Sequence, residues 1–213
     1  MKKNLKANIT WLALVLVIFF LLFGLISAGI IDIYYTQILM GIGISIIMAL
    51  GTNLVLGFSG QLSLGQAGFM AIGAYATAIL TTQNPTYAGF YLSIIVGMIV
   101  TATIALVVGI PTLRLKGDYL AIATLGVAEI IRKLIENGGD LTNGSRGIMG
   151  ILKYTTWPVV FVFVVLITIF VLNYLRSPMG REVLAVREDE IAAEAMGVNT
   201  TKIKVLTFMI AAV

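Results

Sequence analysis

Long apolar stretches separated by short polar turns dominate the chain. A helix that crosses a lipid bilayer needs about 20 mostly apolar residues. The fourth of these stretches is expected to end before Pro111, because proline cannot continue the helical hydrogen-bond ladder. The fifth is the most polar. The pattern predicts an all-α transmembrane bundle with about six complete spans, at residues 9–31, 36–56, 62–80, 88–110, 118–135 and 157–175.

The chain becomes apolar once more at its carboxyl end. Its last eight residues, LTFMIAAV, are too few to cross a hydrocarbon core about 30 Å thick. An unfinished helix would leave backbone polar groups exposed to lipid. We therefore expect the start of a seventh span in a chain that is truncated at its C-terminus. Residues 1–213 are interpreted as one transmembrane domain, with a cytoplasmic loop at residues 176–204.

Composition indicates a membrane protein rather than a soluble domain. Hydrophobic residues make up 59% of the chain and charged residues 11%, whereas an ordinary soluble domain carries about 25% charged residues. The chain has no cysteine and no histidine, which excludes disulfides, thiol catalysis, a Ser-His-Asp triad and zinc sites of the usual ligand type. We expect no cofactor, no metal and no nucleic-acid partner, since no Lys/Arg run resembles a nucleic-acid footprint.

Basic residues indicate which turns face the cytoplasm. Short cytoplasmic loops carry an excess of Lys and Arg. If the N-terminal lysines are inside, six spans also place inside the turn near Ser59, the turn at Arg114 and Lys116, and residues 176–204. Ten of the 14 Lys and Arg residues then lie on the cytoplasmic side. A break near residues 57–68 could make that segment re-entrant instead, which would change the count.

The loop at residues 176–204 carries the strongest concentration of charge. Ser177 is a typical N-cap and Pro178 a typical first helical residue, so a short helix is predicted over residues 178–186. A second helix is predicted to begin near Asp189, where acidic residues suit the helix dipole, and Gly197 suits the left-handed residue that closes a helix. Two such helices would form either a docking surface for a soluble partner or a solvated loop between spans.

The same loop resembles the coupling loop of ABC-importer permeases, in the form found in branched-chain amino acid permeases. Within GREVLAVREDEIAAEAMGVN, the Ala-Ala pair and the following glycine are similar to the EAA…G motif of importers generally. Glu190 departs from that motif, because it lies one residue earlier than the motif places its glutamate. The resemblance implies ATPase coupling through Glu190 and the matching residues Gly180, Arg181, Arg187, Glu188, Asp189, Ala192, Ala193 and Gly197.

Two further blocks resemble the same family in the same order. The first is GFSGQLSLGQAGFMAIGAYATAIL at residues 57–80. The second is LRLKGDYLAIATLGVAEIIRKLIEN at residues 113–137, followed by LTNGSRGI at residues 141–148. This pair resembles the one of the family's two permease subtypes that carries the longer arrangement of these blocks. The resemblance implies a multi-pass cell-membrane permease of an importer for leucine, isoleucine or valine. Its implied partners are two cytoplasmic ATP-binding subunits, a second permease subunit, an extracytoplasmic substrate-binding protein and membrane lipid.

Two alternatives remain at this stage. Related permeases for urea and short-chain amides share much of the pattern. An ion-coupled secondary transporter or channel would act without ATP and would need more than one ionisable group near the membrane midplane. No G-x-x-x-x-G-K-[ST] motif occurs in the chain, so it is not expected to hydrolyse ATP or to act as an enzyme. Energy for uphill transport would come from another polypeptide.

Four polar residues are candidates for the translocation path. Small residues in residues 57–80 favour close helix packing, but the amides of Gln61 and Gln66 are poorly placed against lipid. They are expected to face the bundle interior or a wet pathway near the break. Glu129 has Arg132 and Lys133 at i+3 and i+4, so an intrahelical ion pair explains it more simply than an outer gate. The candidates are Gln61, Ser63, Gln66 and Glu129.

Overall fold

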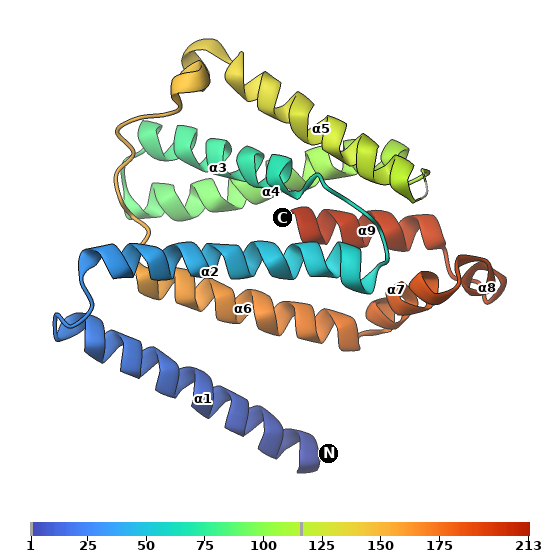
Figure 1. Ribbon diagram of the computed structural model, residues 1–213, viewed down its shortest axis with the longest axis horizontal. Coiled ribbons are helices and arrows are strands. Elements are labelled where there is room, and N and C mark those ends of the chain that lie inside the picture. The colour runs from blue at the N-terminus through green and yellow to red at the C-terminus, as the bar shows by residue number, and fades with distance from the viewer. Residues whose placement is uncertain (1, 116) are drawn as a thin grey trace. The chain divides into compact units, whose positions relative to one another are not determined.

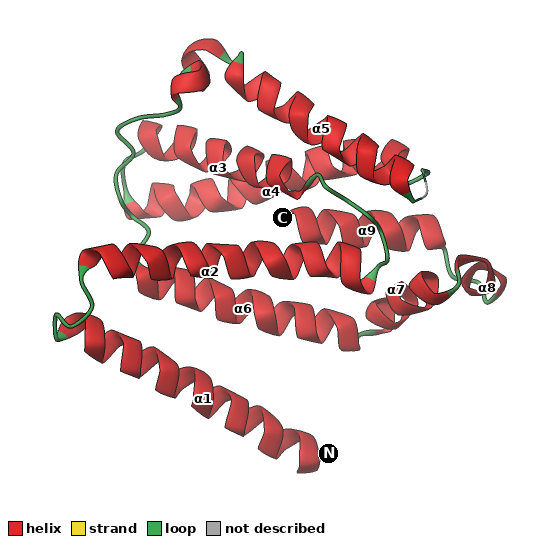
Figure 2. Ribbon diagram, viewed as in Figure 1, coloured by secondary structure: helices red, strands yellow, loops and turns green. Residues whose placement is uncertain are grey.

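The computed structural model describes residues 2–115 and 117–213, and these residues contain helices and no β-strand (Figure 2). The predicted all-α fold class is confirmed. Lys116, assigned above to a cytoplasmic turn, lies outside the described residues. The long helices are α1 (Lys2–Ser27), α2 (Ile33–Asn53), α3 (Gln66–Gln83), α4 (Tyr87–Thr112), α5 (Asp118–Glu136) and α6 (Trp157–Arg176). The others are α7 (Pro178–Glu188), α8 (Glu190–Ala195), α9 (Thr200–Ala212), a π-helix η1 (Leu54–Phe58), and the 3₁₀ turns η2 (Gly139–Leu141) and η3 (Gly144–Arg146).

The six predicted spans correspond to the helices α1 to α6. Among the described residues, three helical stretches are long and apolar enough to cross a membrane by themselves: Ile33–Phe58, which joins α2 and η1, then Tyr87–Thr112 and Trp157–Arg176. The apolar part of α1, Ala13–Ser27, is shorter. Helix α5 carries both acidic and basic side chains along its exposed face. The chain is thus an integral membrane protein whose spans differ in polarity.

The predicted boundaries at Pro111, at residue 62 and at residue 31 are wrong, the last because α1 ends at Ser27. Pro111 does not end α4, which continues to Thr112. Proline removes one backbone donor, but bonding resumes beyond it, because the N–H of Leu113 donates to the carbonyl of Gly109 at 2.9 Å. Helix α3 begins at Gln66 rather than at residue 62, because residues 59–65 are not helical.

The chain divides into two compact units. Unit 1 comprises Met1–Ile47 and Thr155–Phe170. Its α1 packs on the start of α6 through aromatic rings, with the ring of Phe19 at 5.3 Å from Trp157 and 5.4 Å from Phe161. Gly43 lets α2 approach α6 closely, because a Cβ there would lie 2.5 Å from Val160 Cγ1. Within this unit, aromatic rings therefore pack α1 on α6, and a small residue allows α2 to approach α6.

Unit 2 comprises Met48–Tyr154 and Val171–Val213. Helices α3 and α4 pair through small side chains, and the buried hydroxyls of Thr81 and Ser93 share a 3.0 Å hydrogen bond. On another face of α3, Gly68 permits the approach of α5, since a Cβ there would lie 2.9 Å from the Cα of Ala128. These contacts confirm that small residues in this region serve close helix packing.

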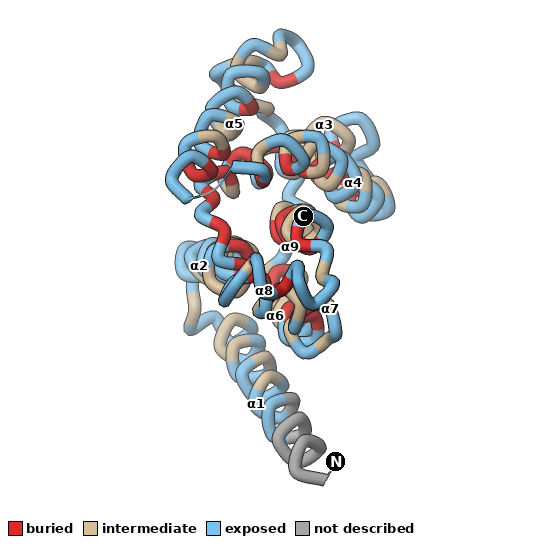
Figure 3. The backbone as a smooth tube through the Cα atoms, turned by 90° about the vertical axis from the view of Figure 1, so that its right-hand side faces the viewer, coloured by how far each residue is buried: buried red, intermediate tan, exposed pale blue. Residues whose placement is uncertain are grey.

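Helix α9 completes the core of unit 2. It contacts α4, α3, η1 and both short helices α7 and α8. Phe208 is 1% exposed and meets Phe69 edge to face, with ring centroids 5.4 Å apart. Buried residues gather where α3, α4, α5 and α9 face one another (Figure 3). The apolar segment at the carboxyl end of the chain is therefore an internal element of this unit.

Three turns assigned to the cytoplasm lie together at one end of unit 2 (Figure 1). They are the break after η1, the turn between α4 and α5, and the short helices α7 and α8. The turn between α3 and α4 and the loop after α5 lie at the opposite end. This arrangement agrees with the alternation expected of α3, α4 and α5 as spans. Which end faces the cytoplasm stays a prediction.

Candidate functional site

Helix α7 begins where the sequence predicts and is seated tightly on the end of α6. The hydroxyl of Ser177 accepts a hydrogen bond from the N–H of Gly180 at 3.1 Å, and Pro178 occupies the first turn. A Cβ on Gly180 would lie 2.5 Å from both the Cα and the carbonyl oxygen of Leu175. Since these are backbone atoms, no side-chain movement can make room. The helix continues to Glu188, two residues beyond the predicted end.

Helix α8 also follows the prediction. The carboxylate of Asp189 accepts hydrogen bonds from two backbone N–H groups in the first turn, at 2.9 and 3.0 Å. Gly197 has φ +88°, and the N–H of Val198 donates to the carbonyl of Ala193 at 3.1 Å. These are features of a Schellman C-cap. The two predicted short helices are confirmed, and we name residues 178–197 the hairpin.

A break in the membrane segment lies beside the hairpin. After η1, residues 59–65 are not helical and their burial alternates. Gln61 and Ser63 are 4% and 8% exposed, whereas Leu62 and Leu64 are 39% and 53% exposed. A period of two is the signature of an extended chain. Along this stretch the polar side chains of Gln61 and Ser63 therefore point inward, and the apolar ones of Leu62 and Leu64 point outward. We name residues 59–65 the break segment.

The interior position expected of Gln61 is confirmed. Its amide nitrogen contacts the hydroxyl of Ser59 and donates to the carbonyl of Lys204 at 3.5 Å. Its amide oxygen is buried and has no hydrogen-bond partner among the described residues. Buried polar atoms without a partner are uncommon and costly. Gln61 is therefore an incompletely satisfied polar group inside unit 2.

Gln66 and Ser63 are also held against protein. The amide nitrogen of Gln66 donates to the carbonyl of Ala211 in α9. The hydroxyl of Ser63 accepts from the N–H of Gly65 at 3.4 Å. The N–H of Leu64 donates to the hydroxyl of Thr124 in α5 at 3.0 Å. Irregular backbone at membrane depth requires such partners, so the break segment is stabilised by α5 and α9.

Arg187 joins the hairpin to the end of η1. Its guanidinium Nη1 donates to the carbonyl of Gly57 at 2.9 Å, across 130 residues of sequence. Gly60 has φ +66°, and a Cβ there would lie 3.0 Å from Arg187 Cγ. The other terminal nitrogen of the guanidinium lies 3.3 Å from Glu188 Oε1. The charged hairpin thus contacts the membrane segment directly.

Glu190 forms a second connection, from α8 to α9. Its carboxylate lies 2.7 Å from the ammonium of Lys204, and the side chains are 29% and 15% exposed. The backbone carbonyl of this same lysine accepts the hydrogen bond from Gln61. The sequence indicated Glu190 but not its partner, because a separation of 14 residues is no local pairing pattern.

Of the remaining predicted coupling residues, some contact the rest of the protein and others are exposed. Arg181 donates to the carbonyl of Arg176 at 3.3 Å, and Ala193 is buried at 5% exposure. Ala192 is exposed. Ile191 and Met196 were not predicted from the sequence. They are 79% and 84% exposed, the highest values among the large apolar residues that the structure describes. The signal was two large apolar residues flanking charged positions in a polar loop.

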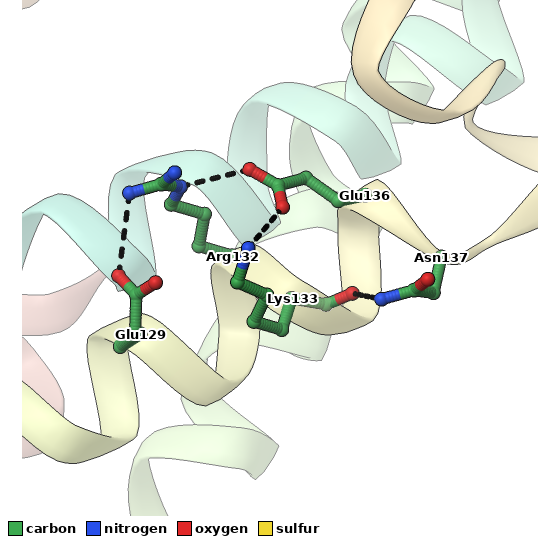
Figure 4. A network of polar contacts seen from close by, with 5 residues as sticks. All are labelled: Glu129, Arg132, Lys133, Glu136 and Asn137. Carbon is green, nitrogen blue, oxygen red and sulfur yellow. Dashed lines mark hydrogen bonds and ion pairs between the residues drawn. The ribbon is translucent and has the colours of Figure 1, made fainter.

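Glu129 lies in a ladder of ion pairs on the exposed face of α5 (Figure 4). Its carboxylate is 3.4 Å from Arg132 Nη1, and both side chains are more than half exposed. Arg132 Nε also binds Glu136 at 2.9 Å, and Lys133 binds Glu136 at 2.7 Å. The predicted intrahelical ion pair is confirmed for Arg132, while Lys133 pairs with Glu136 instead. Glu129 in the translocation path stays a prediction.

These features define a class: a helical membrane protein in which a polar two-helix hairpin contacts an interrupted membrane segment. The family described as "Branched-chain amino acid transport system / permease component" matches residues 34–213, and the chain belongs to this family.

Among its relatives is the high-affinity branched-chain amino acid transport system permease protein LivM of Salmonella typhimurium, which is 36% identical over 66% of this chain and 40% of the relative. The protein of the same name in Escherichia coli has the same identity and coverage. A probable branched-chain amino acid transport permease protein LivM of Methanocaldococcus jannaschii is 29% identical over 64% of this chain and 44% of the relative. The matched region is thus about two fifths of the length of these curated relatives. No solved structure matches the chain.

Proposed function

We propose that the chain is a permease subunit of an ABC importer and forms part of the path for leucine, isoleucine and valine. Family membership and the names of the three relatives support this substrate class over urea or short amides. The observation that carries the mechanism is the contact between Arg187 and the Gly57 carbonyl. It connects the surface suited to an ATPase with the broken membrane segment.

The hairpin would act as the handle for two cytoplasmic ATP-binding subunits. The Gly180 seat, the Asp189 cap and the ion pair between Glu190 and Lys204 give the hairpin few internal degrees of freedom. A rigid element transmits a push, whereas a flexible loop absorbs it. Closure of the ATPases around ATP would displace the hairpin and shift the bundle between inward-open and outward-open arrangements. The exposed Ile191 and Met196 would supply the apolar contacts of docking.

The path itself would follow the inward face of the break segment. Gln61 and Ser63 are buried on that face, and Gln66 begins α3 directly after it. These polar groups would contact the backbone of an amino acid, while its aliphatic side chain would contact neighbouring apolar residues. Glu129 is the weakest member of the proposed set, because its carboxylate is paired on the exposed face of α5.

The complete transporter would need further polypeptides. No Walker A motif occurs in the sequence, so ATP would be hydrolysed by the partner subunits. A second permease subunit would form the other half of the path, and an extracytoplasmic binding protein would deliver the amino acid. Residues 1–213 would form one transmembrane domain in this assembly, with residues 176–204 as its coupling loop.

Reconstituted uptake tests the proposal. The permease is assembled with its second permease and two ATP-binding subunits in vesicles, and uptake of labelled leucine is measured with ATP and the binding protein. We expect uptake only with ATP and with the ATP-binding subunits. Uptake by the permease alone, driven by an ion gradient, would instead establish a secondary transporter.

A substitution adds a test of the coupling role. Glu190→Gln removes the charge that faces Lys204, and we expect the number of leucine molecules imported per ATP to fall several-fold while the helical bundle stays folded. Asp32→Asn, which removes an exposed carboxylate in the turn before α2, is the control. Unchanged coupling in Glu190→Gln would count against the docking role of the hairpin.

A further inference from the structure

We propose that Arg187 is a positioning residue that caps the broken end of α2 and η1, so that residues 57–61 move with the hairpin. The inference rests on the proposed function, because it names the membrane element that receives the push. It goes beyond that function by assigning the motion to one short segment and one side chain. The inference is based on the hydrogen bonds at the end of η1.

A helix that ends inside a membrane protein leaves its last carbonyl groups without helical partners. In η1, the carbonyl of Leu54 accepts from the N–H of Ser59 at 3.2 Å, and that of Val55 accepts from the N–H of Gln61 at 3.1 Å. The next turn of backbone supplies both of these donors. The carbonyl of Gly57 instead receives the guanidinium of Arg187. A charged side chain of the hairpin therefore completes the cap of a membrane helix.

The backbone around the cap is shaped to receive this side chain. Gly60 is in the left-handed region, with φ +66°, where residues with a side chain are disfavoured. The space that a Cβ would occupy at Gly60 is bounded by Arg187 Cγ at 3.0 Å. The stem of Arg187 thus packs on the turn while its head caps the helix. Glu188 lies 3.3 Å from the other nitrogen of the guanidinium and helps to hold its orientation.

A second contact holds the same segment from the other side. Gln61 donates to the carbonyl of Lys204, and the ammonium of Lys204 is paired with Glu190 of α8. Residues 57–61 are consequently connected to α7 through Arg187 and to α8 through Lys204. Beyond η1 the backbone has no helical hydrogen-bond ladder, so it deforms more easily than the neighbouring spans. A displaced hairpin would move this segment before it moved a complete helix.

Spin labels can measure this connection cleanly because the natural chain has no cysteine. Leu62 in the break segment and Ala185 on α7 are both exposed, and each is replaced by cysteine and labelled in the complete transporter. The distance between the labels is measured without nucleotide and with a non-hydrolysable ATP analogue. The number of leucine molecules imported per ATP is measured in parallel.

With Arg187 in place, we expect one narrow distance distribution that ATP binding leaves unchanged, because the two sites move together. Arg187→Met keeps the side-chain length and removes the donors. It should broaden the distribution, make it shift with ATP, and lower import per ATP about tenfold, as expected for loss of a charge-assisted hydrogen bond. Arg187→Lys should restore part of both values, because an ammonium can still donate one bond. Arg114→Met, an identical change at an exposed turn residue, should behave like the unmodified protein.

A second variant tests the inference if Arg187→Met does not assemble into the transporter. Gly60→Ala pushes against the Arg187 stem, whereas Gly29→Ala carries a similar left-handed penalty, at φ +71°, with no atom within 4 Å. The inference is supported if Gly60→Ala lowers the number of leucine molecules imported per ATP and Gly29→Ala does not. Wild-type coupling and an unchanged distance in Arg187→Met, or in Gly60→Ala, would overturn it. The proposed function would survive that result, but it would fall if the unmodified transporter imported no leucine with ATP.

Discussion

The hairpin and α5 both carry several charged side chains, but the polar contacts of the two regions differ in what they join. On α5, each ion pair joins residues three or four positions apart on the exposed face of one helix. In the hairpin region, Arg187 reaches across 130 residues to Gly57, and Glu190 reaches across 14 residues to Lys204. The first cluster stabilises the helix that bears it. The second connects separate elements, namely α7 with η1 and α8 with α9.

The comparison shows that charge content alone does not identify a coupling site. Exposed pairs at helical spacing contribute a few tenths of a kcal/mol and occur in helices of every function. A partly buried pair between two elements requires both elements to be in place. The distance along the sequence between partners therefore separates the two kinds of cluster.

The largest effect is expected from the seat of the hairpin. Gly180→Ala would place a Cβ against the backbone of Leu175, and overpacking of this kind costs about 2 to 3 kcal/mol. Thermal unfolding of the purified permease should show the loss. Gly126→Ala on α5 is the control, because no atom lies within 4 Å of its Cβ position, and it should be neutral or slightly stabilising. Equal stability of the two variants would show that the hairpin is not held at Gly180.

An intermediate effect is expected at the exposed apolar tip of the hairpin. Replacing Ile191 and Met196 together by serine should weaken binding of the ATP-binding subunits by about 2 kcal/mol, which is roughly thirtyfold. The fold should be unaffected, because both side chains are exposed. Co-purification and a binding isotherm measure the loss. The matched double variant on α5, Ile130→Ser with Leu134→Ser, should leave binding of the ATPases unchanged, and equal losses in both would remove the distinction between the two regions.

The smallest effect is expected on α5. Glu129→Gln breaks an exposed ion pair, which contributes no more than about 0.5 kcal/mol. Leucine uptake should remain within about twofold of the unmodified transporter. Glu190→Gln should lower leucine uptake several-fold more than Glu129→Gln does. Loss of uptake in Glu129→Gln comparable to that in Glu190→Gln would place Glu129 in the translocation path and reverse the interpretation of its ladder.

Local chemistry made much of the fold predictable. The hairpin helices follow from Ser177, Pro178, Asp189 and Gly197, because caps and turn residues act within four positions of themselves. Hydrophobic length indicated the positions of the long helices. The late start of α3 was missed, because Leu62 and Leu64 continue the apolar pattern of a helix although the backbone there is not helical.

Contacts between distant segments were not predictable from one sequence. The acceptor of Arg187 is a backbone carbonyl, which any residue provides, so the sequence holds no signal for Gly57. Lys204 was assigned only as a cytoplasmic basic residue, because nothing local indicates a pairing with Glu190. The same holds for the hydrogen bond from Gln66 to the carbonyl of Ala211. The site residues were identified by resemblance, while their connections required the structure.

The hairpin is proposed to be a cytoplasmic handle, and the side of the membrane on which it lies can be measured directly. Met196→Cys introduces one thiol at a position that is 84% exposed in a chain with no other cysteine. A membrane-impermeant thiol reagent is applied to intact cells and to inside-out vesicles, in the absence of the ATP-binding subunits. We predict labelling in the inside-out vesicles and none in intact cells. Labelling of intact cells would place the hairpin outside, where no ATPase could reach it, and would contradict the account.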